Sequence, residues 1–122
     1  MTGPPIYLDL RKAELLLDQF LETAEFRRWA ILAMSIMRSH FHMVVQVCED
    51  PDPKKILADF KAYGSRVLNQ HFGKPASDTW WTTKGSKRKL NDANHLSNAI
   101  NYVLHKQPNP LVVYSTELGR IV

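Results

Sequence analysis

Residues 33–47 read AMSIMRSHFHMVVQV, and this stretch decides the fold. Apolar and β-branched residues fill both of its halves, and the dipeptide Arg38-Ser39 lies between them. Such a pattern predicts two antiparallel strands, over residues 29–37 and 40–47, joined by a two-residue turn. The chain should therefore contain a sheet built around this hairpin.

The second strand of this hairpin has two chemically different sides, because residues two apart in a strand point the same way. One side carries His40, His42, Val44 and Gln46. The other side carries Phe41, Met43, Val45 and Val47. The uniformly apolar set is expected to face helices, which leaves the histidines on an open face. Two neighbouring imidazoles can chelate one cation, although an unrelated pair of surface histidines has the same sequence.

Helical and extended patterns surround the hairpin. Asp52 and Pro53 are the N-cap and first residue of one predicted helix, and Pro108 ends another. The predicted helices cover residues 8–26, 53–71 and 92–107. The further predicted strands cover residues 79–83, 88–90 and 110–113, followed by a short loose tail. This order predicts an α+β fold, with an antiparallel sheet that carries its helices on one face.

Length and composition fit one compact domain over residues 1–122 with a sizeable core, since 44% of the residues are hydrophobic. No apolar run is long enough to cross a membrane and no signal-peptide pattern begins the chain, so we expect a cytoplasmic protein. Cys48 is the single cysteine and has no partner for an internal disulfide. The formal net charge of +4 is compatible with a polyanionic partner.

One segment combines tryptophans with clustered cations. Cations neutralise phosphates and aromatic rings stack on bases, so this composition suits a nucleic-acid strand. The other interpretation is a solvated loop beside two partly buried indoles. The predicted nucleic-acid-binding residues are Trp80, Trp81, Lys84, Lys87, Arg88 and Lys89.

The last predicted helix carries a tyrosine outside its apolar stripe. The stripe consists of Leu96, Ala99, Ile100, Val103 and Leu104, at helical spacing. Tyr102 lies roughly 130° from the centre of this stripe, among polar neighbours. A tyrosine placed there can reach a substrate, or it can be an ordinary amphipathic residue at the edge of the core.

Three segments taken together resemble a known family. They are the hairpin AMSIMRSHFHMVVQV, the central DFKAYGSRVLNQHFGKP of residues 59–75, and AINYVLHKQPNP of residues 99–110. Their order and spacing resemble those of the single-tyrosine HUH transposases, which include the IS200-type insertion-sequence transposases and the REP-associated tyrosine transposases. The likeness extends over residues 19–113.

The resemblance implies an RRM-like (ferredoxin-like) α+β fold and a specific chemistry. His40 and His42 would hold Mg²⁺ or Mn²⁺, and Tyr102 would attack a phosphate of single-stranded or hairpin DNA. The product would be a 5′-phosphotyrosine and a free 3′-OH, which allows later rejoining and hence DNA transposition. The family also implies a homodimer, in which the tyrosine helix sometimes serves the site of the other chain.

Two departures from the family pattern matter. The third metal ligand is usually a Gln or Asn four residues after the tyrosine, whereas Lys106 stands there and Gln107 follows it. We predict Gln107 as the third ligand, through a distorted helix end, and His105, Asn98, Gln46 or water remain alternatives.

The second departure concerns the start of the chain. The family's first strand has only residues 6–10 available, so it is predicted to be short or missing. These departures keep two other functions open, a catalytically inactive, domesticated nucleic-acid-binding domain of the same fold and a metal-dependent nuclease that uses water.

Overall fold

The computed structural model describes residues 8–47, 52–75, 80 and 93–121. Three helices and four strands form in this part of the chain. In chain order they are α1 (Leu10–Arg27), β1 (Ala30–Ile36), β2 (Phe41–Gln46), α2 (Pro53–Phe72), α3 (Ala93–His105), β3 (Val112–Ser115) and β4 (Gly119–Arg120). The α+β class is therefore confirmed. Of the strands predicted over residues 79–83 and 88–90, only Trp80 is described, and it is not part of a strand; the other residues lie outside the described part of the chain.

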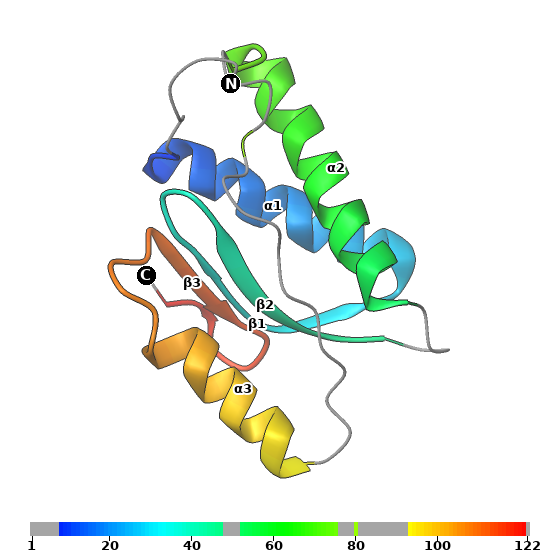
Figure 1. Ribbon diagram of the computed structural model, residues 1–122, viewed down its shortest axis with the longest axis vertical. Coiled ribbons are helices and arrows are strands. Elements are labelled where there is room, and N and C mark those ends of the chain that lie inside the picture. The colour runs from blue at the N-terminus through cyan, green and yellow to red at the C-terminus, as the bar shows by residue number, and fades with distance from the viewer. Residues whose placement is uncertain (1–7, 48–51, 76–79, 81–92, 122) are drawn as a thin grey trace.

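The four strands form one antiparallel sheet in the order β2-β1-β3-β4 (Figure 1). β1 pairs with β2 through the predicted hairpin, and the Met37 N–H donates to the His40 carbonyl at 2.8 Å across the Arg38-Ser39 turn. This turn fixes the register, so that Ile36 lies opposite Phe41. The register shifts by one residue between Ile31 and Ala33, which marks a β-bulge at the far end of the hairpin.

Helices α1 and α2 lie together on one side of the sheet, where most of the core is found (Figure 1). The Phe20 ring of α1 contacts Phe41 of β2 at 4.8 Å and Phe60 of α2 at 5.6 Å between ring centroids. Phe20 and Phe60 are buried, and each contributes about 1.5–3 kcal/mol through the area it removes from water. Phe41, Met43 and Val45 pack against this cluster, as the alternation in β2 predicts.

Helix α3 lies on the opposite side of the sheet, which differs from the prediction that all helices share one face (Figure 1). The physical reason is a second, smaller hydrophobic cluster, in which Val103 of α3 packs with Ala33 of β1 and Val44 of β2. The apolar stripe of α3 is therefore buried against the histidine side of β2. That side is covered in part by α3 and is not fully open.

The helix ends follow local rules. The Asp52 carboxylate accepts the Lys54 N–H at 2.9 Å, which confirms Asp52 as the N-cap of α2. Asp9 caps α1 in the same way, through the Lys12 N–H. No strand precedes α1 in the described residues, although the Leu8 N–H donates to the Arg38 carbonyl at 2.6 Å beside the hairpin turn.

The C-terminal segment is more ordered than predicted. The predicted loose tail instead turns back, and β4 pairs with β3. The Ser115 hydroxyl accepts the Leu118 N–H at 2.9 Å inside this turn, and Gly119 adopts a φ of 73°, which glycine tolerates without strain. Among the described helices, none has the length and apolar character that a bilayer crossing requires.

Candidate active site

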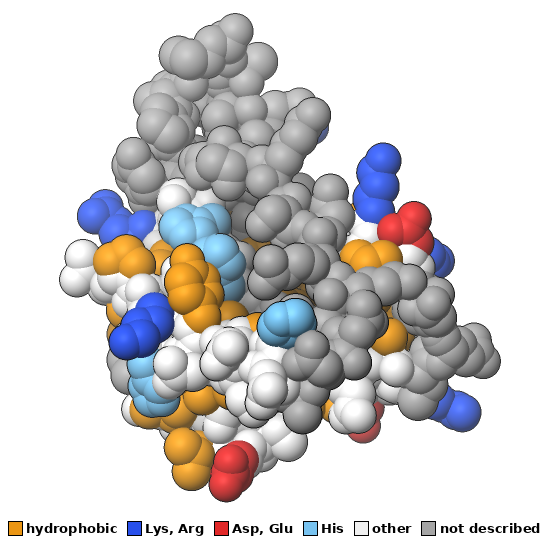
Figure 2. Space-filling view, turned by 60° about the horizontal axis from the view of Figure 1, so that its bottom comes forward, with side chains coloured by type: hydrophobic (Ala, Val, Ile, Leu, Met, Phe, Trp, Pro, Cys, Tyr) orange, Lys and Arg blue, Asp and Glu red, His pale blue; other side chains and the backbone are white. Residues whose placement is uncertain are grey.

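The histidine pair lies at the start of β2, next to the hairpin turn. The His40 and His42 ring centroids are 5.2 Å apart, with ring planes at 88°. The Ser39 hydroxyl lies 3.0 Å from His40 Nδ1, which leaves Nε2 of that ring for another partner. Both histidines are half-buried, and Figure 2 shows histidine side chains in contact with each other at the surface of this face.

Tyr102 reaches the histidine pair from α3 within the same chain. Its ring centroid lies 6.1 Å from that of His42, and its side chain is 53% exposed. The neighbouring Val103 is buried at 5% exposure and holds the helix on the sheet. Val103 and Tyr102 are consecutive in the helix and therefore point in different directions, so that Val103 packs on the sheet while Tyr102 faces the histidines.

The surroundings favour the uncharged form of His42. Burial lowers the pKa of the His42 imidazole below its ordinary value of 6.5, and the neighbouring His40 lowers it further. A neutral imidazole is the form that binds a metal ion. The position of His42 therefore favours the neutral imidazole, in which one ring nitrogen can accept a bond.

The described residues provide some, but not all, of the ligands that a divalent ion needs. The described residues hold no cluster of three or more His, Cys, Asp or Glu side chains suited to a metal, so His105 does not complete one with His40 and His42. Within the described residues, a third protein ligand would have to be of another kind, such as an amide oxygen. Two imidazoles with oxygen ligands suit Mn²⁺ at least as well as Mg²⁺.

Gln107 lies just beyond the end of α3, which stops at His105. Its side-chain amide donates to the Tyr102 carbonyl at 3.4 Å, so the side chain folds back along the last helical turn. The structure brings Gln107 to the backbone of Tyr102, but it shows no contact between Gln107 and the two histidines in the described residues. The alternatives Asn98 and Gln46 are exposed side chains on α3 and at the far end of β2.

Of the residues that we predict to bind nucleic acid, the structure describes only Trp80. Trp80 is buried at 4% exposure, and its indole N–H donates to the Asn69 side-chain oxygen at 2.9 Å. Trp80 is thus a core residue here, which differs from the expected stacking surface, because a buried ring offers no face to a base. The remaining predicted residues lie outside the described part of the chain; they are Trp81, Lys84, Lys87, Arg88 and Lys89.

A residue that the sequence analysis missed lies beside the histidines. Ser35 of β1 pairs directly with His42 across the hairpin, and it is buried. The signal was present in the sequence, because a two-residue turn at Arg38-Ser39 places residue 35 opposite residue 42. A lone hydroxyl inside an apolar strand that faces a histidine is a candidate supporting group.

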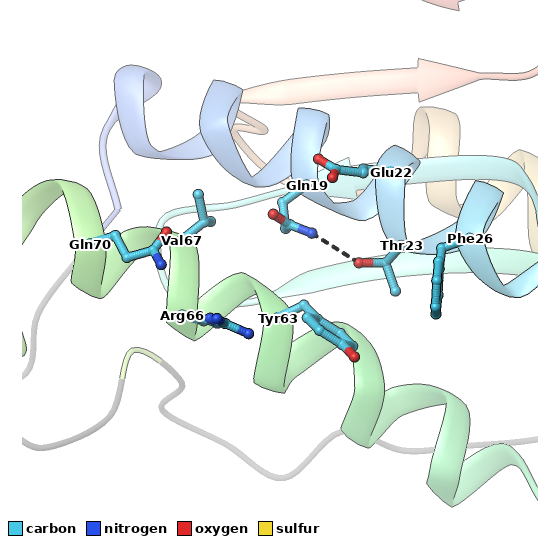
Figure 3. Close-up of a pocket in the computed structure, with 8 residues that line it drawn as sticks. All are labelled: Gln19, Glu22, Thr23, Phe26, Tyr63, Arg66, Val67 and Gln70. Carbon is cyan, nitrogen blue, oxygen red and sulfur yellow. Dashed lines mark hydrogen bonds between the residues drawn. The ribbon is translucent and has the colours of Figure 1, made fainter.

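A separate hollow lies between α1 and α2, away from the histidine pair (Figure 3). Its volume is about 380 Å³, and the Gln19 side-chain amide donates to the Thr23 hydroxyl at 3.1 Å in its wall. No histidine lines it. The lining residues are Gln19, Glu22, Thr23, Phe26, Tyr63, Arg66, Val67 and Gln70.

The fold and the site place the chain in a class of α+β domains that carry a histidine pair on a sheet strand and a tyrosine on a neighbouring helix. Residues 7–106 match the family described as "Transposase IS200 like". This match covers most of the 122 residues, so the chain belongs to the IS200-like transposase family. The resemblance found in the sequence is thereby confirmed, and the family gives the chain a role in DNA transposition. No curated protein and no solved structure matches the chain significantly.

Proposed function

We propose that this domain cleaves and rejoins single-stranded DNA through a covalent bond to Tyr102. The observation that carries the proposal is the grouping of three side chains on one face. The His42 ring lies 5.2 Å from His40 and 6.1 Å from Tyr102. Family membership supports the same reaction class.

In the proposed reaction, the phenol oxygen of Tyr102 attacks a phosphodiester in line. The new bond joins this oxygen to phosphorus, and the bond to the 3′ oxygen breaks. The phenolic proton leaves to solvent at this exposed position, and the 3′ oxygen takes up a proton from solvent. The downstream strand stays on Tyr102 as a 5′-phosphotyrosine, and the upstream strand leaves with a free 3′-OH. A later attack by a 3′-OH reverses the step, so rejoining needs no ATP.

His40 and His42 are the proposed ligands of a Mg²⁺ or Mn²⁺ ion, with Gln107 as the third. When bound, such an ion would polarise a phosphate oxygen and stabilise the negative charge of the transition state. The two imidazoles orient the phosphate toward Tyr102, because they lie on a rigid strand. The side chains of α3 from position 94 onward include no acidic residue, which favours the approach of a DNA strand to this face.

Covalent capture of labelled DNA tests the reaction. The protein is incubated with Mn²⁺ and a single-stranded hairpin DNA labelled at its 3′ end, and the products are separated under denaturing conditions. We expect labelled protein, which Tyr102→Phe and His42→Ala abolish. The matched control is Tyr114→Phe, because Tyr114 lies on β3 and packs against the other side of the sheet.

Other outcomes identify other functions. If DNA is cut as well by Tyr102→Phe as by the native protein, the domain is a metal-dependent nuclease that uses water. Salt-sensitive DNA binding without any metal requirement or adduct would identify an inactive, domesticated binding domain. The cation Lys106, at the family's usual amide position, is the feature that favours this alternative.

We further propose that the domain acts as a homodimer, as its family resemblance implies. Sedimentation velocity measures the oligomeric state directly. The structure supports attack within one chain, because Tyr102 and His42 of the same chain lie together. A mixture of Tyr102→Phe and His42→Ala proteins should then stay inactive, whereas recovered adduct would show that each chain serves the site of the other.

A further inference from the structure

Ser35 is a buried polar residue whose hydroxyl has no partner among the described residues. The residue is 0% exposed, and its Oγ makes no hydrogen bond. It lies in the middle of β1, which is paired with β2 on one side and β3 on the other. Buried hydroxyls are ordinarily hydrogen-bonded, so an unpaired one calls for an explanation.

Ser35 faces the candidate site. It is the cross-strand partner of His42, and directly opposed residues project to the same side of a sheet. Ala33, two residues earlier, packs under α3, which places Ser35 on the same covered side. Opposed Cβ atoms are about 4.5–5.5 Å apart in such pairs, a spacing that a serine and a histidine side chain can bridge with one hydrogen bond.

The two histidines differ in what supports their rings. His40 Nδ1 already has the Ser39 hydroxyl at 3.0 Å. The His42 ring contacts the rings of His40 and Tyr102, but it makes no hydrogen bond within the described chain. An imidazole that binds a metal through one nitrogen needs an acceptor for the N–H on the other, which fixes its tautomer and orientation. Within the part of the chain that the structure describes, the His42 ring has no such acceptor and the Ser35 hydroxyl has no donor.

We propose that Ser35 positions His42 for metal binding, by accepting the ring N–H that faces away from the ion. The inference rests on the proposed metal site and names a residue that supports it. Ser39, in the hairpin turn, would accept the Nδ1–H of His40 in the same way. The pair would thus be held by two hydroxyls, one from the turn and one from the neighbouring strand.

Metal affinity without DNA tests this role. Free Mn²⁺ is measured by electron paramagnetic resonance, and thermal unfolding is followed on the metal-free proteins. We expect Ser35→Ala to weaken Mn²⁺ binding about tenfold or more, and to leave the melting midpoint unchanged or higher. Ser35→Thr keeps the hydroxyl and should bind Mn²⁺ within about threefold of the native protein.

Ser115→Ala is the matched control. Ser115 is a buried serine on the adjacent strand β3, but its Oγ accepts the Leu118 N–H at 2.9 Å. We expect this variant to melt at a lower temperature and to keep its Mn²⁺ affinity. The two serines should therefore affect stability and metal binding in opposite ways.

The outcomes separate this inference from the metal site itself. If the native protein binds no Mn²⁺, or His42→Ala binds it equally well, the metal site is wrong and Ser35 has no role in it. If His42 is required but Ser35→Ala binds Mn²⁺ as tightly as the native protein, the role of Ser35 alone is refuted. Equal weakening by folded Ser35→Ala and Ser35→Thr would also refute it, because the hydroxyl would then not matter.

Discussion

Helix α3 brings Tyr102 to the histidines only while it stays packed on the sheet, and Val103 is the buried side chain of α3 in that contact. Val103 is 5% exposed and contacts the cluster that contains Ala33 and Val44. Val103→Ala removes part of this contact and leaves the Tyr102 side chain unchanged. The variant therefore tests whether α3 occupies this face of the sheet.

The size of the effect follows from three terms. Removing the equivalent of two buried methylenes costs about 1.6 kcal/mol. The cavity left under α3 adds about 0.5–1 kcal/mol. Alanine has the higher helix propensity, which offsets about 0.5 kcal/mol of this loss. We expect Val103→Ala to lower the free energy of unfolding by about 2 kcal/mol.

Urea denaturation and thermal melting measure this loss. For a domain of this size, about 2 kcal/mol corresponds to a fall of roughly 6–10 °C in Tm. Asn101→Ala is the matched control, because Asn101 is an exposed residue on the same helix and also gains helix propensity. Its stability should stay within about 0.5 kcal/mol of the native value. Equal stability of the two variants would show that α3 is not held on this face, and the grouping of Tyr102 with the histidines would lose its basis.

Three further predictions concern other parts of the molecule. The pKa of His42 is lower in the folded than in the unfolded chain, so the free energy of unfolding should fall as pH drops below about 6.5. Urea titrations at pH 7.5 and 5.5 measure this loss of stability, and His42→Ala should make it smaller. Arg28 ends α1 in the left-handed region with a φ of 62°, so Arg28→Gly should raise Tm by a few degrees, corresponding to about 0.5–1 kcal/mol, and a lower Tm would contradict this view of the cap. Trp80→Phe should cost about 1–3 kcal/mol in urea denaturation, because it leaves the Asn69 oxygen without the indole N–H, whereas an unchanged midpoint would refute the core position of Trp80.

The features that were predicted correctly from the sequence are those that depend on local sequence patterns. The hairpin turn at Arg38-Ser39, the two faces of β2 and the cap of α2 at Asp52 all depend on residues within a few positions of one another. Strand alternation and helix capping are properties of the backbone itself, so they can be read before any tertiary contact is known. The position of Tyr102 off the apolar stripe of α3 belongs to the same group.

The tertiary structure decided which surfaces meet. An apolar stripe shows that α3 packs against something, but both sides of the sheet carry apolar residues, and Ala33 with Val44 placed it on the histidine side. That choice sets the 6.1 Å approach of Tyr102 to His42. On the other side of the sheet, tertiary packing buried Trp80 in the core beside Asn69 of α2, although its aromatic character alone was equally compatible with an exposed stacking surface.

The sequence by itself determined the class of fold, the hairpin and the kinds of side chain that the site contains. Only the tertiary structure decided that α3 brings Tyr102 to the side of the sheet that His42 and Ser35 share. The physical reason is that secondary structure depends on neighbours along the chain, whereas the meeting of α3 with β1 and β2 depends on burying apolar area between segments about 60 residues apart.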